Sequence, residues 1–173
     1  MHLANISDSA IARIIVELIY AATLCYGCIS DIRSFKIPNF ISIIVLVLFF
    51  LNYFLLTSAG GLTGRLLLAG CTLILGFALY AAGFVGAGDV KLIGALMLWA
   101  GPRHGFDFLL LMTIIGGIFA ALLLIAQRSM AAWPSVACYI PSSRLKSWAK
   151  AGKFPYGIAI CGAGLFLMPT FFA

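Results

Sequence analysis

Two aspartates stand out among the residues that could do chemistry in this chain. Only five residues are acidic, and two of them, Asp31 and Asp89, each lie at the end of a long apolar segment. Two carboxylates alone suit one hydrolytic reaction, in which they share a proton, one activates a water molecule and the other polarises the scissile carbonyl. The pair therefore predicts an aspartic hydrolase centre.

Each aspartate also has a purely structural interpretation. Asp31 could be an interfacial residue that pairs with Arg33 or Lys36. Asp89 could be the N-cap of the helix that follows it, because Asp is favoured at that position. Their common placement on one side of the membrane, argued below, favours the functional interpretation.

No metal, cofactor or disulfide framework is expected. His2 and His104 are isolated from the cysteines, so no ligand set with zinc spacing is present. The cysteines are odd in number, and Cys25 and Cys28 lie one helical turn apart inside an apolar segment. The reaction is therefore expected to need neither a metal nor thiol chemistry.

The composition excludes a water-soluble fold. Hydrophobic residues make up 64% of the 173 residues and charged residues only 9%, against roughly 25% charged in a soluble domain. A bilayer core of about 30 Å needs roughly 20 apolar residues per helix. We expect one all-α, polytopic membrane domain over residues 1–173 with the lipid bilayer as solvent, and no nucleic-acid partner despite the net charge of +6.

About six transmembrane helices are expected. The first apolar segment shows no signal-peptide cleavage site and is expected to remain as a helix. The fourth segment is short, which suggests a water-filled cleft beside Asp89 or, equally, a locally thin bilayer. A further apolar segment, 130–140, is broken by Pro134 and is expected to lie at the interface. The expected spans are Ile11–Ser30, Pro38–Thr57, Leu62–Gly83, Asp89 to just before Gly101, Phe106–Ala126, and Pro155 to the end.

The Lys and Arg residues predict the orientation of these spans. With an even number of spans, eight basic residues fall on one side and three on the other, which puts the richer side in the cytoplasm and both termini outside. Asp31 and Asp89 then lie at the cytoplasmic face. The richer side holds Arg33, Lys36, Lys91, Arg128, Arg144, Lys146, Lys150 and Lys153, and the other Arg13, Arg65 and Arg103.

Glycines surround the second aspartate in the segment Gly86-Ala87-Gly88-Asp89. Glycine lets a backbone turn freely and approach a substrate closely. A nucleotide site is rejected, because the third glycine of a dinucleotide fingerprint is missing and no Lys-Ser/Thr follows. Gly86 and Gly88 are therefore expected to shape a loop beside Asp89.

Three segments resemble the type IV prepilin peptidases. Residues 86–92 resemble the Gly-x-Gly-Asp-x-Lys-Leu signature of that family, and the turn from Asp31 through Ile37, Pro38 and Asn39 resembles its other motif. Residues 154–160 resemble its C-terminal Pro-Tyr-Gly segment. The core of the resemblance covers residues 27–99. The Gly-x-Gly-Asp motif alone is less specific, because presenilin-like proteases share it.

The resemblance implies that Asp31 and Asp89 are a catalytic pair that cuts the short basic leader of a prepilin or pseudopilin at the cytoplasmic face of the bacterial inner membrane. Larger members add a methyltransferase region with paired Cys-x-x-Cys motifs, whereas Cys25-x-x-Cys28 lies inside a span. The chain thus resembles the small CpaA/TadV-like branch that serves Flp pili in tight adherence, with other pilus-assembly proteins as candidate partners. Residues expected to bind substrate or shape loops are Gly86, Gly88, Lys91, Arg33, Lys36, Pro38, Asn39, Tyr156 and Gly157.

Two other classes of protein stay open at this point. Intramembrane acids also serve proton relays in transporters, although transporter sites lie near the midplane and often in repeated halves. A non-catalytic membrane subunit of a pilus or secretion system would tolerate loss of either aspartate. A peptidase is the preferred hypothesis, because both aspartates are predicted at one face and no internal repeat is visible.

Overall fold

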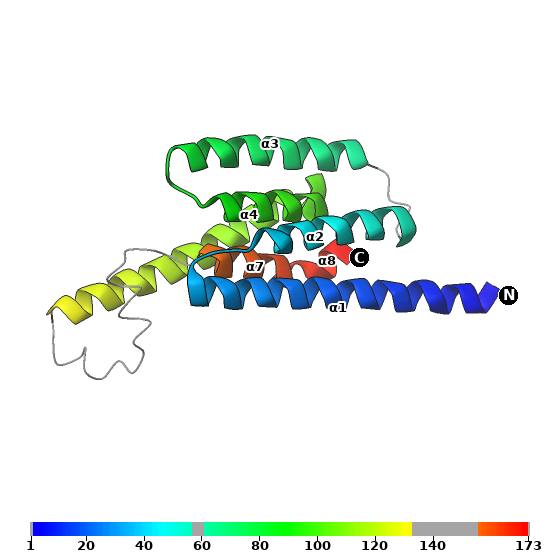
Figure 1. Cartoon of the computed structure of the whole chain (residues 1–173), viewed down its shortest axis with the longest axis horizontal. Coiled ribbons are helices and arrows are strands. Elements are labelled where there is room, and N and C mark those ends of the chain that lie inside the picture. The colour runs from blue at the N-terminus through cyan, green and yellow to red at the C-terminus, as the bar shows by residue number, and fades with distance from the viewer. Residues whose placement is uncertain (1, 57–60, 133–155, 173) are drawn as a thin grey trace.

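The computed structural model describes residues 2–56, 61–132 and 156–172, and these form a bundle of helices (Figure 1). The first three residues of the expected interfacial segment 130–140 form the end of α4, and the rest of it, with the basic stretch after it, lies outside the described residues. The elements are α1 (His2–Ser34), α2 (Asn39–Leu51), a π-helical turn η1 (Asn52–Leu56), α3 (Leu62–Ala81), α4 (Ala87–Ala132), α7 (Tyr156–Phe166) and α8 (Met168–Phe172).

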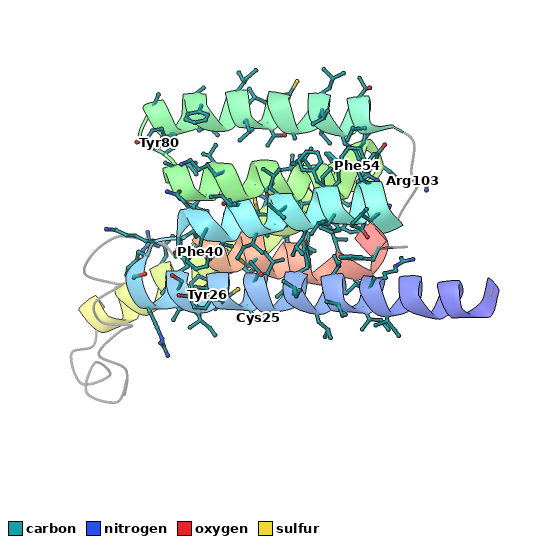
Figure 2. All side chains as sticks on the ribbon, turned by 45° about the vertical axis from the view of Figure 1, so that its right-hand side comes forward. Cys25, Tyr26, Phe40, Phe54, Tyr80 and Arg103 are labelled. Atoms are coloured by element: carbon teal, nitrogen blue, oxygen red, sulfur yellow. The ribbon has the colours of Figure 1, made fainter. Side chains whose placement is uncertain are left out.

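The prediction of an all-α membrane protein is confirmed. Within the described residues, three helical segments, Ala10–Ser34, Leu62–Ala81 and Ala87–Ile125, are long and apolar enough to cross a membrane, and two shorter apolar helices, Asn39–Leu55 and Tyr156–Phe166, accompany them. Large apolar side chains are exposed over the outside of the bundle. Figure 2 shows such side chains along the helices, with Tyr80 and Arg103 towards opposite ends. This outer surface suits lipid.

Helix α4 is bent rather than divided by a loop. The predicted fourth and fifth spans form one helical segment, interrupted only at Gly101, whose φ of 59° and ψ of −175° are not helical. Pro102 resumes the helix directly, whereas the fifth span was predicted to begin at Phe106. Figure 1 shows the chain reversing at this bend, so that arms 87–100 and 102–132 run back on each other. The predicted boundary at Gly101 is therefore correct, but the predicted loop is wrong.

Other predicted boundaries shift by a few residues. Helix α1 continues past Ser30 to Ser34, and α2 begins at Asn39 with Pro38 as its N-cap rather than in its first turn. The last predicted span is divided at Leu167 into α7 and α8. Asp31 consequently lies inside the final turn of α1 and not after it.

The core joins α1, α2, the first arm of α4 and the C-terminal helices. Trp99 is buried at its centre, with ring contacts to Tyr20, Phe49 and Phe172. Its indole N–H donates to the Val45 carbonyl at 3.0 Å. Among the described elements, the backbone of α3 comes close only to that of α4, with the Arg65 guanidinium 5.9 Å from the centre of the Phe49 ring in α2, so α3 lies at the edge of the bundle.

Candidate active site

Asp31 is buried at the contact between α1 and α7. Its side chain is only 4% exposed, and its Oδ2 atom has no hydrogen-bond partner among the described residues. The backbone N–H groups of Gly157 and Ile158, at the start of α7, face the carboxylate. A Cβ atom at Gly157 would lie 2.7 Å from Oδ2 of Asp31. The α7 backbone therefore approaches Asp31 as closely as it does only because residue 157 is glycine.

The last turn of α1 fixes the position of Asp31 along the bundle. The Asp31 carbonyl accepts a hydrogen bond from the N–H of Phe35 at 2.9 Å, and the Ser34 hydroxyl donates to the Ser30 carbonyl at 2.8 Å. Phe35 adopts the left-handed conformation, with a φ of 52°, which costs a non-glycine residue about 1–2 kcal/mol. This tight turn sends the chain back into α2 directly after Asp31.

Asp89 lies in the first turn of α4, half-buried and at the same end of the bundle. It interacts electrostatically with Asp31, and the backbone N–H of Gly86 faces its carboxylate. A carboxylate in a first helical turn is stabilised by the helix dipole and by free N–H groups. The interpretation of Asp89 as an N-cap is wrong, because α4 begins two residues earlier, at Ala87. The fold thus brings the two aspartates together from segments 58 positions apart in the sequence.

The two glycines before Asp89 act differently from the prediction. Gly88 belongs to α4, and neither it nor Gly86 has a positive φ. The left-handed turn between α3 and α4 is made by Gly83, with a φ of 80°. Gly88 is instead required by packing, because a Cβ there would lie 2.9 Å from the carbonyl oxygen of Ile37. The segment 86–92 therefore packs, at Gly88, directly against the backbone of the segment 31–39.

Lys91 and Asn39 connect the same two segments. The Lys91 ammonium donates a hydrogen bond to the Asn39 side-chain oxygen at 3.3 Å. Asn39 opens α2, directly after the N-cap residue Pro38. The hydrogen bond thus joins two of the predicted site residues across the contact between α2 and α4.

Arg33, Lys36 and Tyr156 are exposed side chains. Arg33 and Lys36 are exposed, and the Lys36 carbonyl accepts a hydrogen bond from Ser30. In the described parts of the chain the ion pairs are Arg13–Glu17 and His104–Asp107, so neither basic residue pairs with Asp31. Tyr156 is 50% exposed and would meet a Cβ at Gly116 of α4. The structural interpretation of Asp31 as an ion-pair partner therefore fails among the described residues.

Sequence reasoning missed the thiols beside the acid pair. Cys28 lies three residues before Asp31, and Cys161 lies four residues after Gly157, so helical spacing places both on the faces that meet at Asp31. Cys161 is fully buried, and its Sγ atom would lie 3.0 Å from a Cβ at Gly27. Cys28 packs against the buried cluster that contains Cys161. This spacing was the signal that could have found them.

Fold and site together define a class: a helical membrane protein whose two acids meet at one end of the bundle. Among the described residues no group of three or more His, Cys, Asp or Glu gathers as a metal site. The model of the type IV leader peptidase family matches residues 18–121. This match covers more than half of the chain, and the chain belongs to that family. Neither the curated proteins nor the solved structures gave a match.

Membership of this family indicates the general function of the chain. It implies a membrane peptidase with a type IV leader peptidase-like activity on prepilin-like substrates. The matched region contains both aspartates, the segment 86–92 and the turn 31–39. A peptidase is thereby favoured over the transporter and the non-catalytic subunit that the sequence left open.

Proposed function

We propose that the chain is an intramembrane aspartic endopeptidase in which Asp31 and Asp89 are the catalytic pair. The observation that carries the proposal is the Asp31 carboxylate, which is 4% exposed, has an unpartnered Oδ2 atom and lies within electrostatic reach of Asp89. A buried polar atom left without a partner costs stability. Such an atom next to a second carboxylate is readily explained by a group that handles a proton during a reaction.

The reaction follows from a pair that shares one proton. The ionised carboxylate takes a proton from a water molecule, and the hydroxide so formed attacks the scissile carbonyl carbon. The protonated carboxyl gives its proton to the carbonyl oxygen, which produces a neutral tetrahedral intermediate. The first aspartate then passes its new proton to the amide nitrogen, the second takes a proton back from a hydroxyl of the intermediate, and the C–N bond breaks to leave a carboxylic acid and an amine. Glycine at positions 86 and 157 leaves room beside both carboxylates.

The proposed substrate is an Flp-type prepilin, cut between its short basic leader and its membrane helix at the cytoplasmic face. The basic residues predicted on the side of Asp31 and Asp89 support this orientation, with both termini outside the inner membrane. A transmembrane helix has no free backbone amides and must unwind at the cleavage point. A site at the end of the bundle, where α1, α4 and α7 begin or end, suits such a segment.

Co-expression with candidate prepilins tests the proposal. Asp31→Asn and Asp89→Asn keep the side-chain shape but cannot exchange the proton, so each should abolish removal of the leader on gels while the amount of inserted protein stays the same. Asp107→Asn, at an exposed aspartate paired with His104, is the matched control and should process normally. Normal processing by either of the first two variants would falsify the aspartic mechanism and revive the transporter and assembly-subunit hypotheses.

A further inference from the structure

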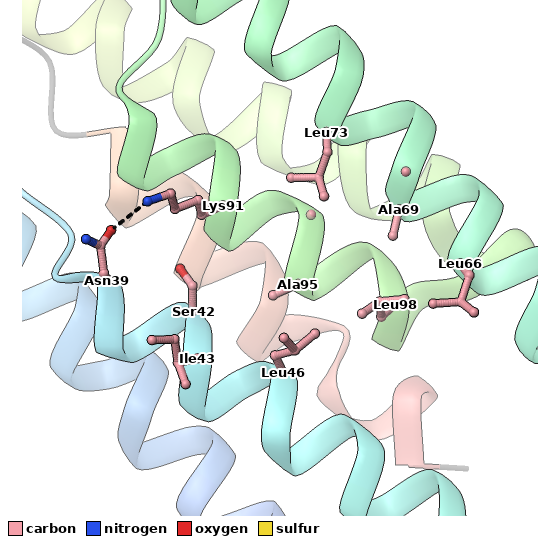
Figure 3. A pocket seen from close by; sticks show the side chains of 12 residues that line it. Asn39, Ser42, Ile43, Leu46, Leu66, Ala69, Leu73, Lys91, Ala95 and Leu98 are labelled. Atoms are coloured by element: carbon pink, nitrogen blue, oxygen red, sulfur yellow. Dashed lines mark hydrogen bonds between the residues drawn. The ribbon is translucent and has the colours of Figure 1, made fainter.

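A groove of about 550 Å³ lies between α2, α3 and the first arm of α4, and neither Asp31 nor Asp89 lines it. Because the backbone of α3 comes close only to that of α4 among the described elements, a gap remains between α3 and α2, with α4 as its floor. Figure 3 shows this groove, with the hydrogen bond between Lys91 and Asn39 at one end and Leu66 and Leu98 at the other. The polar end begins two residues after Asp89.

The lining residues have the spacing of helix-binding faces. Each of the three helices contributes four positions in the pattern i, i+3, i+4 and i+7, starting at Asn39, Leu66 and Lys91. This pattern is the stripe that a helix presents to a neighbouring helix. It extends over two turns, or about 10 Å along each axis. The groove is therefore lined by three helical stripes that have no partner helix among the described residues.

Small residues lie at the middle of each stripe. The second position is Ser42 in α2, Ala69 in α3 and Gly94 in α4, where the Leu73 side chain of α3 already occupies the place that a Cβ would take. Gly70 follows in α3, and a Cβ built there would meet nothing within 4 Å. In membranes, helix pairs associate through small residues because these let the backbones approach. A lipid acyl chain would need no such spacing.

Two polar groups on the groove lack a full set of partners. Ser42 is 8% exposed, and its hydroxyl oxygen has no hydrogen-bond partner among the described residues. The Lys91 ammonium contacts the neutral Asn39 amide but no carboxylate of the described chain. The first turn of any helix has four N–H groups without internal partners, and an unwound segment before it has free carbonyls. Ser42 can accept from the former, and Lys91 can donate to the latter.

We propose that this groove binds the membrane helix of the substrate, in the part that follows the scissile bond. The inference rests on the proposed function, because it places the start of the substrate helix at Lys91, the end of the groove that lies two residues along α4 from Asp89. The apolar length of the substrate packs on the small positions of α2, α3 and α4. The first turn of the substrate helix lies at Ser42, and the unwound segment before it passes Lys91 and enters the site.

Filling the groove tests this inference in the full-length protein. Gly70→Leu adds a side chain in the groove, and Gly117→Leu is the matched control, because Gly117 is also a helical glycine whose Cβ would meet nothing within 4 Å. The probes are a synthetic substrate with a basic leader and an apolar segment of about 20 residues, and the same peptide truncated after the first turn of that segment. Gly70→Leu should lower cleavage of the long peptide about tenfold or more, mainly through KM, and leave the short one unchanged. Gly117→Leu should affect neither.

A crosslink supplies a readout that does not depend on activity. A photoreactive phenylalanine at Ile43, on the groove wall, should capture the long peptide in the inactive Asp89→Asn background. The same group at Ile74, 72% exposed on α3 and not part of the groove, should not. The proposed role of the groove is overturned if Gly70→Leu lowers cleavage of both peptides equally, if it lowers cleavage of neither, or if no crosslink forms at Ile43. If the wild-type protein cleaves neither peptide nor any prepilin, the proposed function itself fails.

Discussion

The backbone of α7 positions Asp31 more than any side chain does. The N–H groups of Gly157 and Ile158 face its carboxylate, and the missing Cβ of Gly157 leaves the room that the carboxylate occupies. Charged groups at membrane depth are costly and usually functional. A small change at Gly157 should therefore act directly on the acid pair.

Gly157→Ala is the sharpest test at this scale. The added Cβ would lie 2.7–2.9 Å from three side-chain atoms of Asp31, so the carboxylate must move. We expect leader removal to fall at least about tenfold, equivalent to 1.4 kcal/mol or more at the transition state. The rate is measured with purified protein and a candidate prepilin.

Gly162→Ala is the control in the same helix. Its Cβ would meet only Ile115, at an ordinary 3.8 Å, so activity should remain near that of the wild type. Equal rates for the two variants would mean that Asp31 does not have to hold its observed position.

At the scale of elements, Arg65 stabilises the bend in α4. Gly101 breaks the helix with a backbone conformation that is essentially restricted to glycine. Carbonyls at the end of the first arm then lack helical partners. The Arg65 guanidinium of α3 donates to the carbonyls of Leu98 and Trp99, both at 2.9 Å. A charged group predicted only as an orientation signal thus caps a buried helix end.

Replacing Arg65 by Met should destabilise the fold. The carbonyls of buried Leu98 and Trp99 would lose a charged donor, at a cost of about 2–4 kcal/mol in the free energy of unfolding. We expect the midpoint of thermal unfolding in detergent to drop by several degrees. Arg103→Met, at an exposed residue near the same bend, should leave it nearly unchanged. Similar midpoints for the two variants would remove the capping role.

The contact between α4 and the turn before α2 makes a second prediction for elements. Gly88→Val places branched carbons against the Ile37 carbonyl, which would already lie 2.9 Å from a Cβ. The turn and α4 must separate, so cleavage should fall about tenfold or more while the protein still inserts. Ala87→Val, at a position that already has a Cβ, should be milder when assayed beside it. Equal effects would show that this contact has no special role.

For the whole molecule, the bundle has an acid end and an opposite end. Helix α1 runs towards the acid end and α7 runs away from it, so α1 begins and α8 ends on the opposite side (Figure 1). The basic residues predict that the acid end faces the cytoplasm. That orientation decides whether a cytoplasmic leader can reach the site.

Labelling of single cysteines checks the orientation in cells. In a background without native cysteines, Ser143→Cys should react with an impermeant thiol reagent only after permeabilisation, and Ser58→Cys should react from outside. Both positions lie outside the described residues, so the experiment also places the two loops. The reverse pattern would put the acid pair on the wrong side for the proposed substrate.

The sequence by itself indicated that the chain lies in lipid, that its fold is all-α, and that Asp31 and Asp89 are the candidate acids. A chain with 64% hydrophobic residues cannot build a water-facing surface, and only five acidic residues left few candidates for chemistry. The segments 31–39 and 86–92 predicted the family that the match over residues 18–121 then showed. These features are local, because composition and short motifs do not depend on how helices pack.

Only the tertiary structure decided why particular residues are needed. Gly88 looked like a turn residue, but its neighbour across the bundle, the Ile37 carbonyl, is what excludes a side chain. Arg65 and Cys161 contact residues that are distant along the chain, Leu98 and Gly27 respectively. The Ser42 hydroxyl is buried and has no hydrogen-bond partner among the described residues. None of this can be seen from the neighbouring sequence. Contacts between helices depend on how each helix is rotated about its axis and how deep it lies in the bundle. A transmembrane helix is apolar both where it faces lipid and where it faces protein, so its sequence shows almost no pattern that reveals its rotation or its depth.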